Sequence, residues 1–147
     1  MKTAWARKQN GFTLIELIIV IVVIGILASI IYVSFTVTEQ RSRDAQRDRD
    51  IFEVQRALEK YYADNGTYPS VGSDNTGYPL SSLTLALTPT YISQIPTAPS
   101  AVTYQYVRGA PSTGSYGIEM NYESKPNCHR GVNNQGVGWW SLQACVQ

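Results

Sequence analysis

The chain has 147 residues, which is enough for one ordinary domain and little more. Its 12 basic and 11 acidic residues leave a formal net charge of +1. This balance argues against a dedicated nucleic-acid-binding protein, which usually carries a strong basic excess. Charged residues make up only 16% of the chain, below the roughly 25% of typical soluble domains. The average conceals three consecutive segments of different chemistry.

The amino-terminal segment is a short basic stretch followed by a long apolar one. Residues 1–11 carry three bases and no acid, and residues 12–33 form an apolar run of 22 residues whose one charge is Glu16. A helix of that length spans about 33 Å, enough for the ~30 Å hydrocarbon core of a bilayer. The sequence therefore predicts a membrane helix over residues 12–35, with the amino end held in the cytoplasm by the preceding positive charges.

Other kinds of targeting segment share part of this pattern. A cleaved secretory signal has an apolar region of roughly 7 to 15 residues, which is shorter than this run. An uncleaved signal anchor fits the hydropathy but gives no role to Glu16, because a carboxylate inside a membrane helix is unfavourable without a partner. Glu16 either lies close enough to the interface to reach water or is reserved for a partner. A cut between Gly11 and Phe12 would create an ammonium one helical turn away.

The run GFTLIEL at residues 11–17 resembles the prepilin cleavage motif of type IV pilins and type II secretion pseudopilins. The resemblance implies cleavage after Gly11 by a membrane prepilin peptidase, usually with N-methylation of Phe12. It also implies that Glu16 aligns each subunit with its neighbour during filament assembly. Many pilins have a proline further along this helix, whereas here no proline occurs before Pro69.

Residues 36–65 are predicted to continue the helix in amphipathic form. Six bases and six acids lie between residues 39 and 60, and no Gly or Pro interrupts the chain from residue 29 to residue 65. Apolar residues recur with helical spacing at Ile51, Val54 and Leu58, and Asn65-Gly66 supplies a stop. The charged face is either a solvated surface or a set of inter-subunit salt bridges. Its interleaved acids argue against direct nucleic-acid binding.

Residues 66–147 are predicted to form a globular head, with all seven prolines of the chain and only six charges. The leucines from Leu80 to Leu87 have the spacing of a short helix that Pro89 ends. Residues 102–106 and 116–122 alternate as strands, and residues 139–142 supply a possible third. The expected fold class is α+β and type IV pilin-like, with a long N-terminal helix packed against a small antiparallel sheet. The first of the three segments divides after Gly11, so the predicted bounds are 1–11 for the leader, 12–35 for the membrane helix, 36–65 for the amphipathic helix and 66–147 for the head.

Two cysteines, Cys128 and Cys145, lie 17 residues apart near the C-terminus. On the extracellular side they can form one disulfide only, and many pilins close a C-terminal loop in this way. The alternative is metal binding by these cysteines and His129, which lacks a fourth ligand. No metal site is expected at residues 73–77, which offer one carboxylate, or at residues 96–99, where major pseudopilins often carry an acid for calcium.

The expected role is structural, because no catalytic constellation is evident; neither enzyme activity nor a cofactor is expected. The leading prediction is a type IV pilus subunit, cleaved after Gly11 and polymerised through its N-terminal helix with its own copies. The expected partners are the prepilin peptidase, the pilus assembly platform and motor machinery, and the cytoplasmic membrane before assembly into an extracellular filament. The alternatives are a pseudopilin of a type II secretion system and an uncleaved, signal-anchored surface-binding protein.

Overall fold

The computed structural model describes residues 11–100, 102–133 and 143–145, with the backbone alone for residues 30–34 and 113. The chain divides into two compact units, one up to Thr38 and one from Glu39 onward. A single helix, α1 (Leu14–Asn65), contributes to both. Among the described residues, no helix combines the length and the apolar character that crossing a membrane requires. The membrane role predicted for residues 12–35 stays a prediction.

The second half of α1 is amphipathic, as its sequence predicts. Ile51, Val54 and Leu58 are fully buried, whereas Phe52, Glu53 and Arg56 between them are exposed. The helix ends at the predicted stop, where Gly66 has a φ of 70° and donates its N–H to the Tyr62 carbonyl at 2.8 Å. A left-handed residue after the last turn is a common helix terminus, and glycine adopts it without a steric cost.

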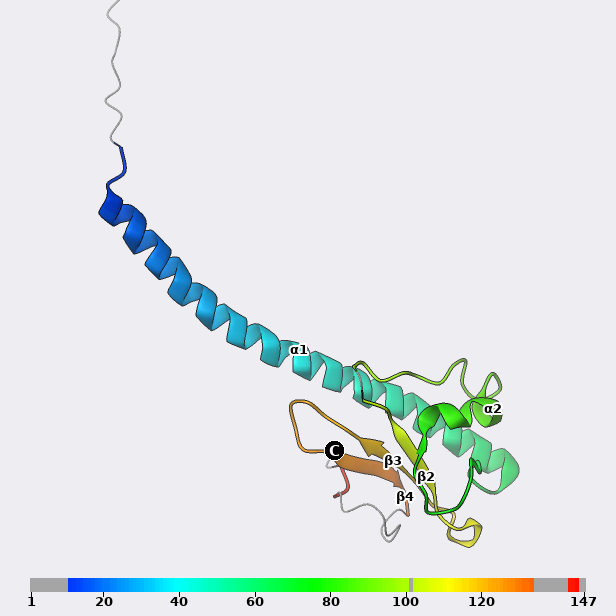
Figure 1. Ribbon diagram of the computed structural model, residues 1–147. Coiled ribbons are helices and arrows are strands. Elements are labelled where there is room, and N and C mark those ends of the chain that lie inside the picture. Colours follow the sequence, from blue (N-terminus) through cyan, green and yellow to red (C-terminus); the bar gives the residue numbers. More distant parts are fainter. Residues whose placement is uncertain (1–10, 101, 134–142, 146–147) are drawn as a thin grey trace, which may run out of the picture. The chain divides into compact units, whose positions relative to one another are not determined.

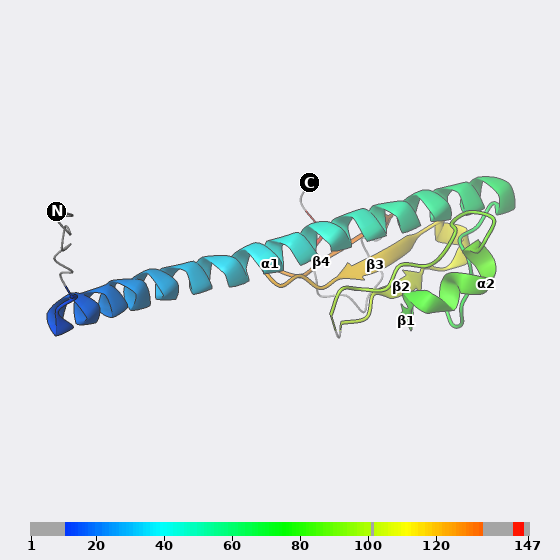
Figure 2. The ribbon, with the colours of Figure 1, turned by 90° about the horizontal axis from the view of Figure 1, so that it is seen from above.

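A four-stranded antiparallel sheet packs on the Glu39–Asn65 half of α1 (Figure 1). In the view from above, β2, β3 and α2 lie alongside that half of the helix (Figure 2). Short helices occupy two of its connections. This arrangement confirms the α+β, type IV pilin-like fold. In chain order the elements after α1 are β1 (Tyr78–Pro79), η1 (Leu80–Leu83), α2 (Thr84–Leu87), β2 (Gln105–Arg108), η2 (Pro111–Thr113), β3 (Tyr116–Met120) and β4 (Cys128–Val132).

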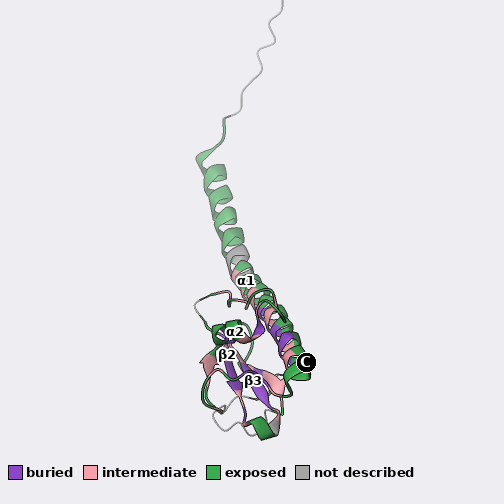
Figure 3. Ribbon diagram, turned by 90° about the vertical axis from the view of Figure 1, so that its right-hand side faces the viewer, coloured by how far each residue is buried: buried purple, intermediate pink, exposed green. Residues whose placement is uncertain are grey.

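The core of the head lies between α1 and the sheet, and Figure 3 shows in purple the buried residues of α1, β2 and β3. Alternate side chains of β2 and β3 enter it, because successive residues of a strand point to opposite faces. The leucines of η1 and α2 complete it beside the strands. The principal members are Ile51, Val54, Ala57, Leu58, Leu80, Leu83, Leu87, Tyr104, Tyr106, Tyr116, Ile118 and Met120.

The predicted sheet differs from the observed one at its edges. The strand expected over residues 139–142 lies outside the described residues. Strand β4 was not predicted, because Cys-His-Arg-Gly-Val shows no alternation of apolar and polar residues. It pairs with β3 from Tyr116↔Val132 to Met120↔Cys128. The two strands approach closely at Gly131, where a Cβ would lie 2.0 Å from the Tyr116 carbonyl oxygen.

Candidate processing and assembly site

The residues that precede α1 form the predicted cleavage site. Gly11, Phe12 and Thr13 lie outside the helix, and Phe12 is 92% exposed. A Cβ at Gly11 would meet no other atom within 4 Å. The peptide bond between Gly11 and Phe12 therefore belongs to an irregular, open stretch of chain, the kind of segment that proteases cut.

Glu16 is held at the helix start by Thr13. The Glu16 carboxylate accepts hydrogen bonds from the Thr13 amide at 2.8 Å and from the Thr13 hydroxyl at 2.7 Å. In return, the Glu16 amide donates to Thr13 Oγ1 at 3.3 Å. This reciprocal arrangement is a capping box, which satisfies donors that the first helical turn leaves without a partner.

The capping box also explains why α1 begins at Leu14 and not at Phe12. Thr13 was not singled out from the sequence, although its spacing of three residues from Glu16 is the signature of this motif. The predicted partner of Glu16 was an ammonium on Phe12. That group does not exist in the uncut chain, so the carboxylate binds Thr13 instead. The structure brings Gly11, Phe12 and Glu16 together at one end of α1, while both cysteines belong to the head.

Apolar side chains surround the helix after this point. The large hydrophobic residues from Phe12 to Leu27 are each between 47% and 92% exposed, without a buried stripe among them. A helix that is apolar on all sides is stable only when something else covers it. The described residues of the chain supply no such cover for this stretch.

The head is fastened to α1 by a buried guanidinium. Arg47 is fully buried and donates to Asp44 Oδ1 at 2.6 Å and to Glu123 Oε1 at 2.5 Å. It also donates to the Pro99 carbonyl and the Ser100 hydroxyl, both at 2.9 Å. A buried charge is tolerated only when it is paired and hydrogen-bonded in this way. We call these five residues the Arg47 cluster; it joins two loops of the head to the helix.

The two carboxylates of the Arg47 cluster are strongly acidic. Burial alone would raise the pKa of Asp44, but the hydroxyl of Ser124, the amides of Glu123 and Ser124, and Arg47 outweigh it and lower that pKa to about 2. Hydrogen bonds from Arg43 and Arg47 likewise lower the pKa of Glu123 to about 2. Both groups are therefore ionised near neutral pH, and neither is poised for proton transfer.

The structure joins Cys128 and Cys145 in a disulfide with a Cα–Cα distance of 5.0 Å, the pairing that the sequence predicts. Two backbone hydrogen bonds flank it: His129 donates to the Gln143 carbonyl, and Cys145 donates to the His129 carbonyl, both at 3.0 Å. The alternative metal site at these cysteines lacks thiolates, because both sulfurs are in the disulfide bond. The disulfide fixes the described end of the chain to strand β4.

No metal site is formed within the described ranges. The one carboxylate of residues 73–77, Asp74, is occupied by Arg108, which donates to it at 2.8 Å and 2.5 Å. No group of three or more His, Cys, Asp or Glu residues in this part of the chain is arranged to hold an ion. Asp74 thus acts as the partner of a structural arginine.

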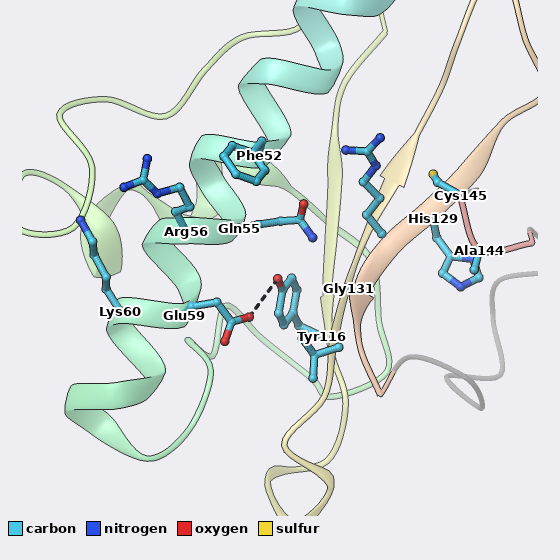
Figure 4. Close-up of a pocket in the computed structure, with 12 residues that line it drawn as sticks. Phe52, Gln55, Arg56, Glu59, Lys60, Tyr116, His129, Gly131, Ala144 and Cys145 are labelled. Carbon is cyan, nitrogen blue, oxygen red and sulfur yellow. Dashed lines mark hydrogen bonds between the residues drawn. The ribbon is translucent and has the colours of Figure 1, made fainter. Parts of the chain in front are cut away.

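A cavity of about 600 Å³ lies between α1 and β4 (Figure 4). Its one acid, Glu59, accepts a hydrogen bond from the Tyr116 hydroxyl at 3.3 Å, and burial raises the pKa of that tyrosine. The other lining side chains of α1 are Phe52, Gln55, Arg56 and Lys60. They do not pair a nucleophile with a general base.

Comparison with known proteins gives matches at both scales, the motif and the whole chain. The model of the prokaryotic N-terminal methylation motif matches residues 6–32. The type II secretion system core protein G of Vibrio cholerae is 29% identical over 93% of this chain and 95% of its own length. The protein of the same name in Escherichia coli is 29% identical over 90% and 92%, respectively. That of Aeromonas hydrophila is 38% identical over 44% and 45%.

No solved structure matches the chain. The motif match covers Gly11, Phe12 and Glu16, and the Vibrio cholerae and Escherichia coli relatives cover nearly the full length. The fold, the position of the cleavage motif before a long helix, and these relatives agree with one another. These findings fit the family of type IV pilins and type II secretion pseudopilins.

Proposed function

We propose that this protein is a structural subunit of a type II secretion pseudopilus. It is made as a precursor, anchored in the cytoplasmic membrane by residues 12–35, cut after Gly11 by a prepilin peptidase, and polymerised with its own copies. One observation carries the proposal: an open Gly11–Phe12 bond stands directly before a helix whose apolar side chains are exposed on all sides. Cutting this bond removes the polar leader and leaves a helix that needs apolar cover.

The surroundings of the apolar helix change when the subunit passes from the membrane into the filament. Lipid surrounds the helix while the subunit waits in the membrane, and the helices of neighbouring copies replace the lipid in the filament. Because hydrocarbon and apolar side chains are similar environments, the transfer does not expose the apolar surface to water. The assembly platform and its motor supply the work of extraction. No enzymatic activity is part of this role.

Cleavage changes the surroundings of Glu16. In the precursor, the Thr13 amide and hydroxyl bind its carboxylate. After cleavage, the ammonium of Phe12 is a stronger partner, since an ion pair in an apolar environment neutralises two charges. When the ammonium of one copy meets the carboxylate of the next, the two subunits are fixed in register. Glu16 is therefore the proposed assembly residue, and Gly11 and Phe12 are the proposed processing residues.

A type IV pilus on the cell surface is the second candidate. The names of the relatives favour the secretion system. The disulfide between Cys128 and Cys145 favours the pilus, because it closes the C-terminal loop as in many pilins. Both candidates use the same cleavage and the same helix. They differ in whether the filament stays associated with the cell envelope or extends from the cell surface.

Intact mass spectrometry of the membrane, periplasmic and sheared surface fractions tests the proposal. We expect a species that begins at Phe12, lighter by two hydrogens through the disulfide and heavier by one methylene if the amine is methylated. Processed protein confined to the cell-associated fractions supports the pseudopilus, whereas abundant processed protein in the sheared fraction favours the pilus. A chain that keeps its leader in every fraction would refute both and favour a signal-anchored protein.

A further inference from the structure

The basic residues of the compact unit that begins at Glu39 fall into two groups. Five of them form ion pairs with described acids: Arg43, Arg47, Arg108, Lys125 and Arg130. Four others form no ion pair within the described part of the chain: Arg41, Arg49, Arg56 and Lys60. All four of these are exposed and lie on α1. The positive charge of this unit that has no described ion-pair partner is thus concentrated on the exposed side of α1.

Three of these bases share one line along the helix. Arg49, Arg56 and Lys60 are separated by seven and four residues, which places them on one face. In Figure 4 the side chains of Arg56 and Lys60 leave α1 away from Tyr116, whereas Glu59 points toward it. Phe52 lies about 60° around the helix from this line and is 57% exposed. We call Arg49, Arg56 and Lys60 the basic stripe.

An acidic counterpart lies beside the basic stripe. Glu53 and Asp64 are exposed and form no ion pair with described residues. Burial raises the pKa of the neighbouring Asp50, and the like charge of Glu53 raises it further. At about 100° per residue, Glu53 and Asp64 lie roughly 50° around the helix from the basic stripe. We call these two residues the acidic stripe.

The two stripes have the same spacing. Arg49 and Lys60 are eleven residues apart, and so are Glu53 and Asp64. A parallel copy of α1 displaced by four residues, about 6 Å along its axis, brings Glu53 level with Arg49 and Asp64 level with Lys60 at once. We propose that the basic stripe of one copy docks on the acidic stripe of a second copy at this four-residue offset. This inference rests on the proposed function, which orients all copies in parallel.

The offset has a geometric consequence. Each copy uses its basic stripe toward one neighbour and its acidic stripe toward the other, so the contact is heterologous. Heterologous contacts form a closed ring only when successive copies return to the starting position. Because every contact here shifts the next copy along the axis, the copies form an open helical assembly instead. The charge pairs select the register, while the apolar helix of residues 12–35 supplies the buried surface.

Two reversed variants test the pairing. In R49E/K60E both stripes are negative, and in E53K/D64K both are positive, so each variant alone opposes like charges between copies. We expect the filament yield of each to fall about tenfold or more, since like charges facing each other across an interface are strongly unfavourable. Expressed together with different tags, the variants present opposite charges to each other. We expect the mixture to recover filaments that contain both tags.

The controls separate this inference from the proposed function. R41E reverses an unpaired base outside the stripes, E119K reverses an acid of β3, and both should assemble as the unchanged chain does. Reversed variants that assemble normally alone would show that the stripes are merely solvated and overturn the inference, as would a mixture that fails to recover. If the unchanged chain forms no polymer in any fraction, the proposed function fails.

Disulfide cross-linking tests the same contact without reversing charge. A copy with Arg49→Cys and a copy with Glu53→Cys, expressed together, should form a cross-linked pair of the two tags upon mild oxidation. Arg41→Cys with Glu53→Cys is the matched control and should not. Equal cross-linking of both combinations, or of neither, would contradict the four-residue offset.

Discussion

The two halves of α1 make the most instructive comparison in this molecule. From Leu14 to Leu27 the helix is apolar on every side and exposed, whereas from Glu39 to Asn65 one face is buried under the sheet and the other is charged. In the second half, the sheet and loops of the same chain cover the apolar stripe of the helix, as in an ordinary globular domain. The first half leaves its apolar side chains exposed, and the proposed function assigns their cover to lipid or to other copies. Substitutions in the two halves should therefore act on different properties.

The largest expected effect is on the Arg47 cluster. Arg47→Met keeps the apolar stem but leaves the carboxylates of Asp44 and Glu123 without their shared partner. Breaking a buried ion pair on one side costs about 3 to 5 kcal/mol of folding stability. Thermal and denaturant unfolding of the head measure it. Arg49→Met removes an exposed arginine without an ion pair and should change stability by less than about 0.5 kcal/mol. Equal losses in the two variants would contradict the importance of the cluster.

A matched pair of leucines separates the halves directly. Leu58→Ala opens a cavity in the core of the head and should cost roughly 3 kcal/mol. Leu17→Ala removes the same atoms from the exposed half, so the unfolding midpoint of the head should stay unchanged while assembly weakens. Calorimetry of both variants in detergent, with filament yield measured alongside, checks this. A drop in the melting temperature for Leu17→Ala would mean that the first half is part of the folded core.

Acid should destabilise the head through Asp44. Its pKa is lowered from 3.8 to about 2 in the folded protein. A group with a lowered folded pKa stabilises fully above its unfolded pKa, and this contribution is lost as the pH falls toward the folded value. About 2 kcal/mol should therefore disappear between about pH 4 and pH 2. Asp44→Asn should be less stable at neutral pH and show a flatter acid profile. An unchanged profile in that variant would exclude Asp44 as the cause.

The smallest expected effect concerns the helix start. Thr13→Val removes the hydroxyl that binds Glu16, and losing such a cap costs about 1 kcal/mol locally. Amide hydrogen exchange over residues 14–17 of the uncut chain should accelerate about fivefold. Thr13→Ser keeps the hydroxyl and should exchange as the unchanged chain does. If valine and serine behave alike, the capping box does not hold the first turn.

The helix and its buried face could be predicted from sequence, because helical spacing repeats over many residues at Ile51, Val54 and Leu58. The GFTLIEL motif is short and local, so the proposed processing site could also be predicted from the sequence. Strand β4 could not be found, because its pairing with β3 depends on backbone contacts and not on a periodic pattern. The Arg47 cluster was also missed: Arg47 and Glu123 are far apart in the chain, and no local signal links them.

Oppositely charged neighbours on α1 show the same limit. The spacing of Arg49 with Glu53 and of Arg56 with Glu59 is that of helical ion pairs. The structure forms neither within the described residues: Glu59 instead accepts hydrogen bonds from Tyr68 and Tyr116. Spacing along one helix gives opportunities for contacts, and the packing of the head decides which of them form.

Gly131 limits which substitutions this sequence can accept in strand β4. A Cβ at this position would collide with the backbone of both Tyr116 and Gly117, so even alanine would push β4 away from β3. Strand β4 also carries Cys128, and such a shift would move one end of the disulfide. Variants of this protein that keep the β3–β4 pairing should therefore retain glycine at residue 131. The exposed positions of α2, such as the 98% exposed Leu85, are free to vary. Mutational scanning of the head should show intolerance at residue 131 and tolerance at the exposed positions of α2.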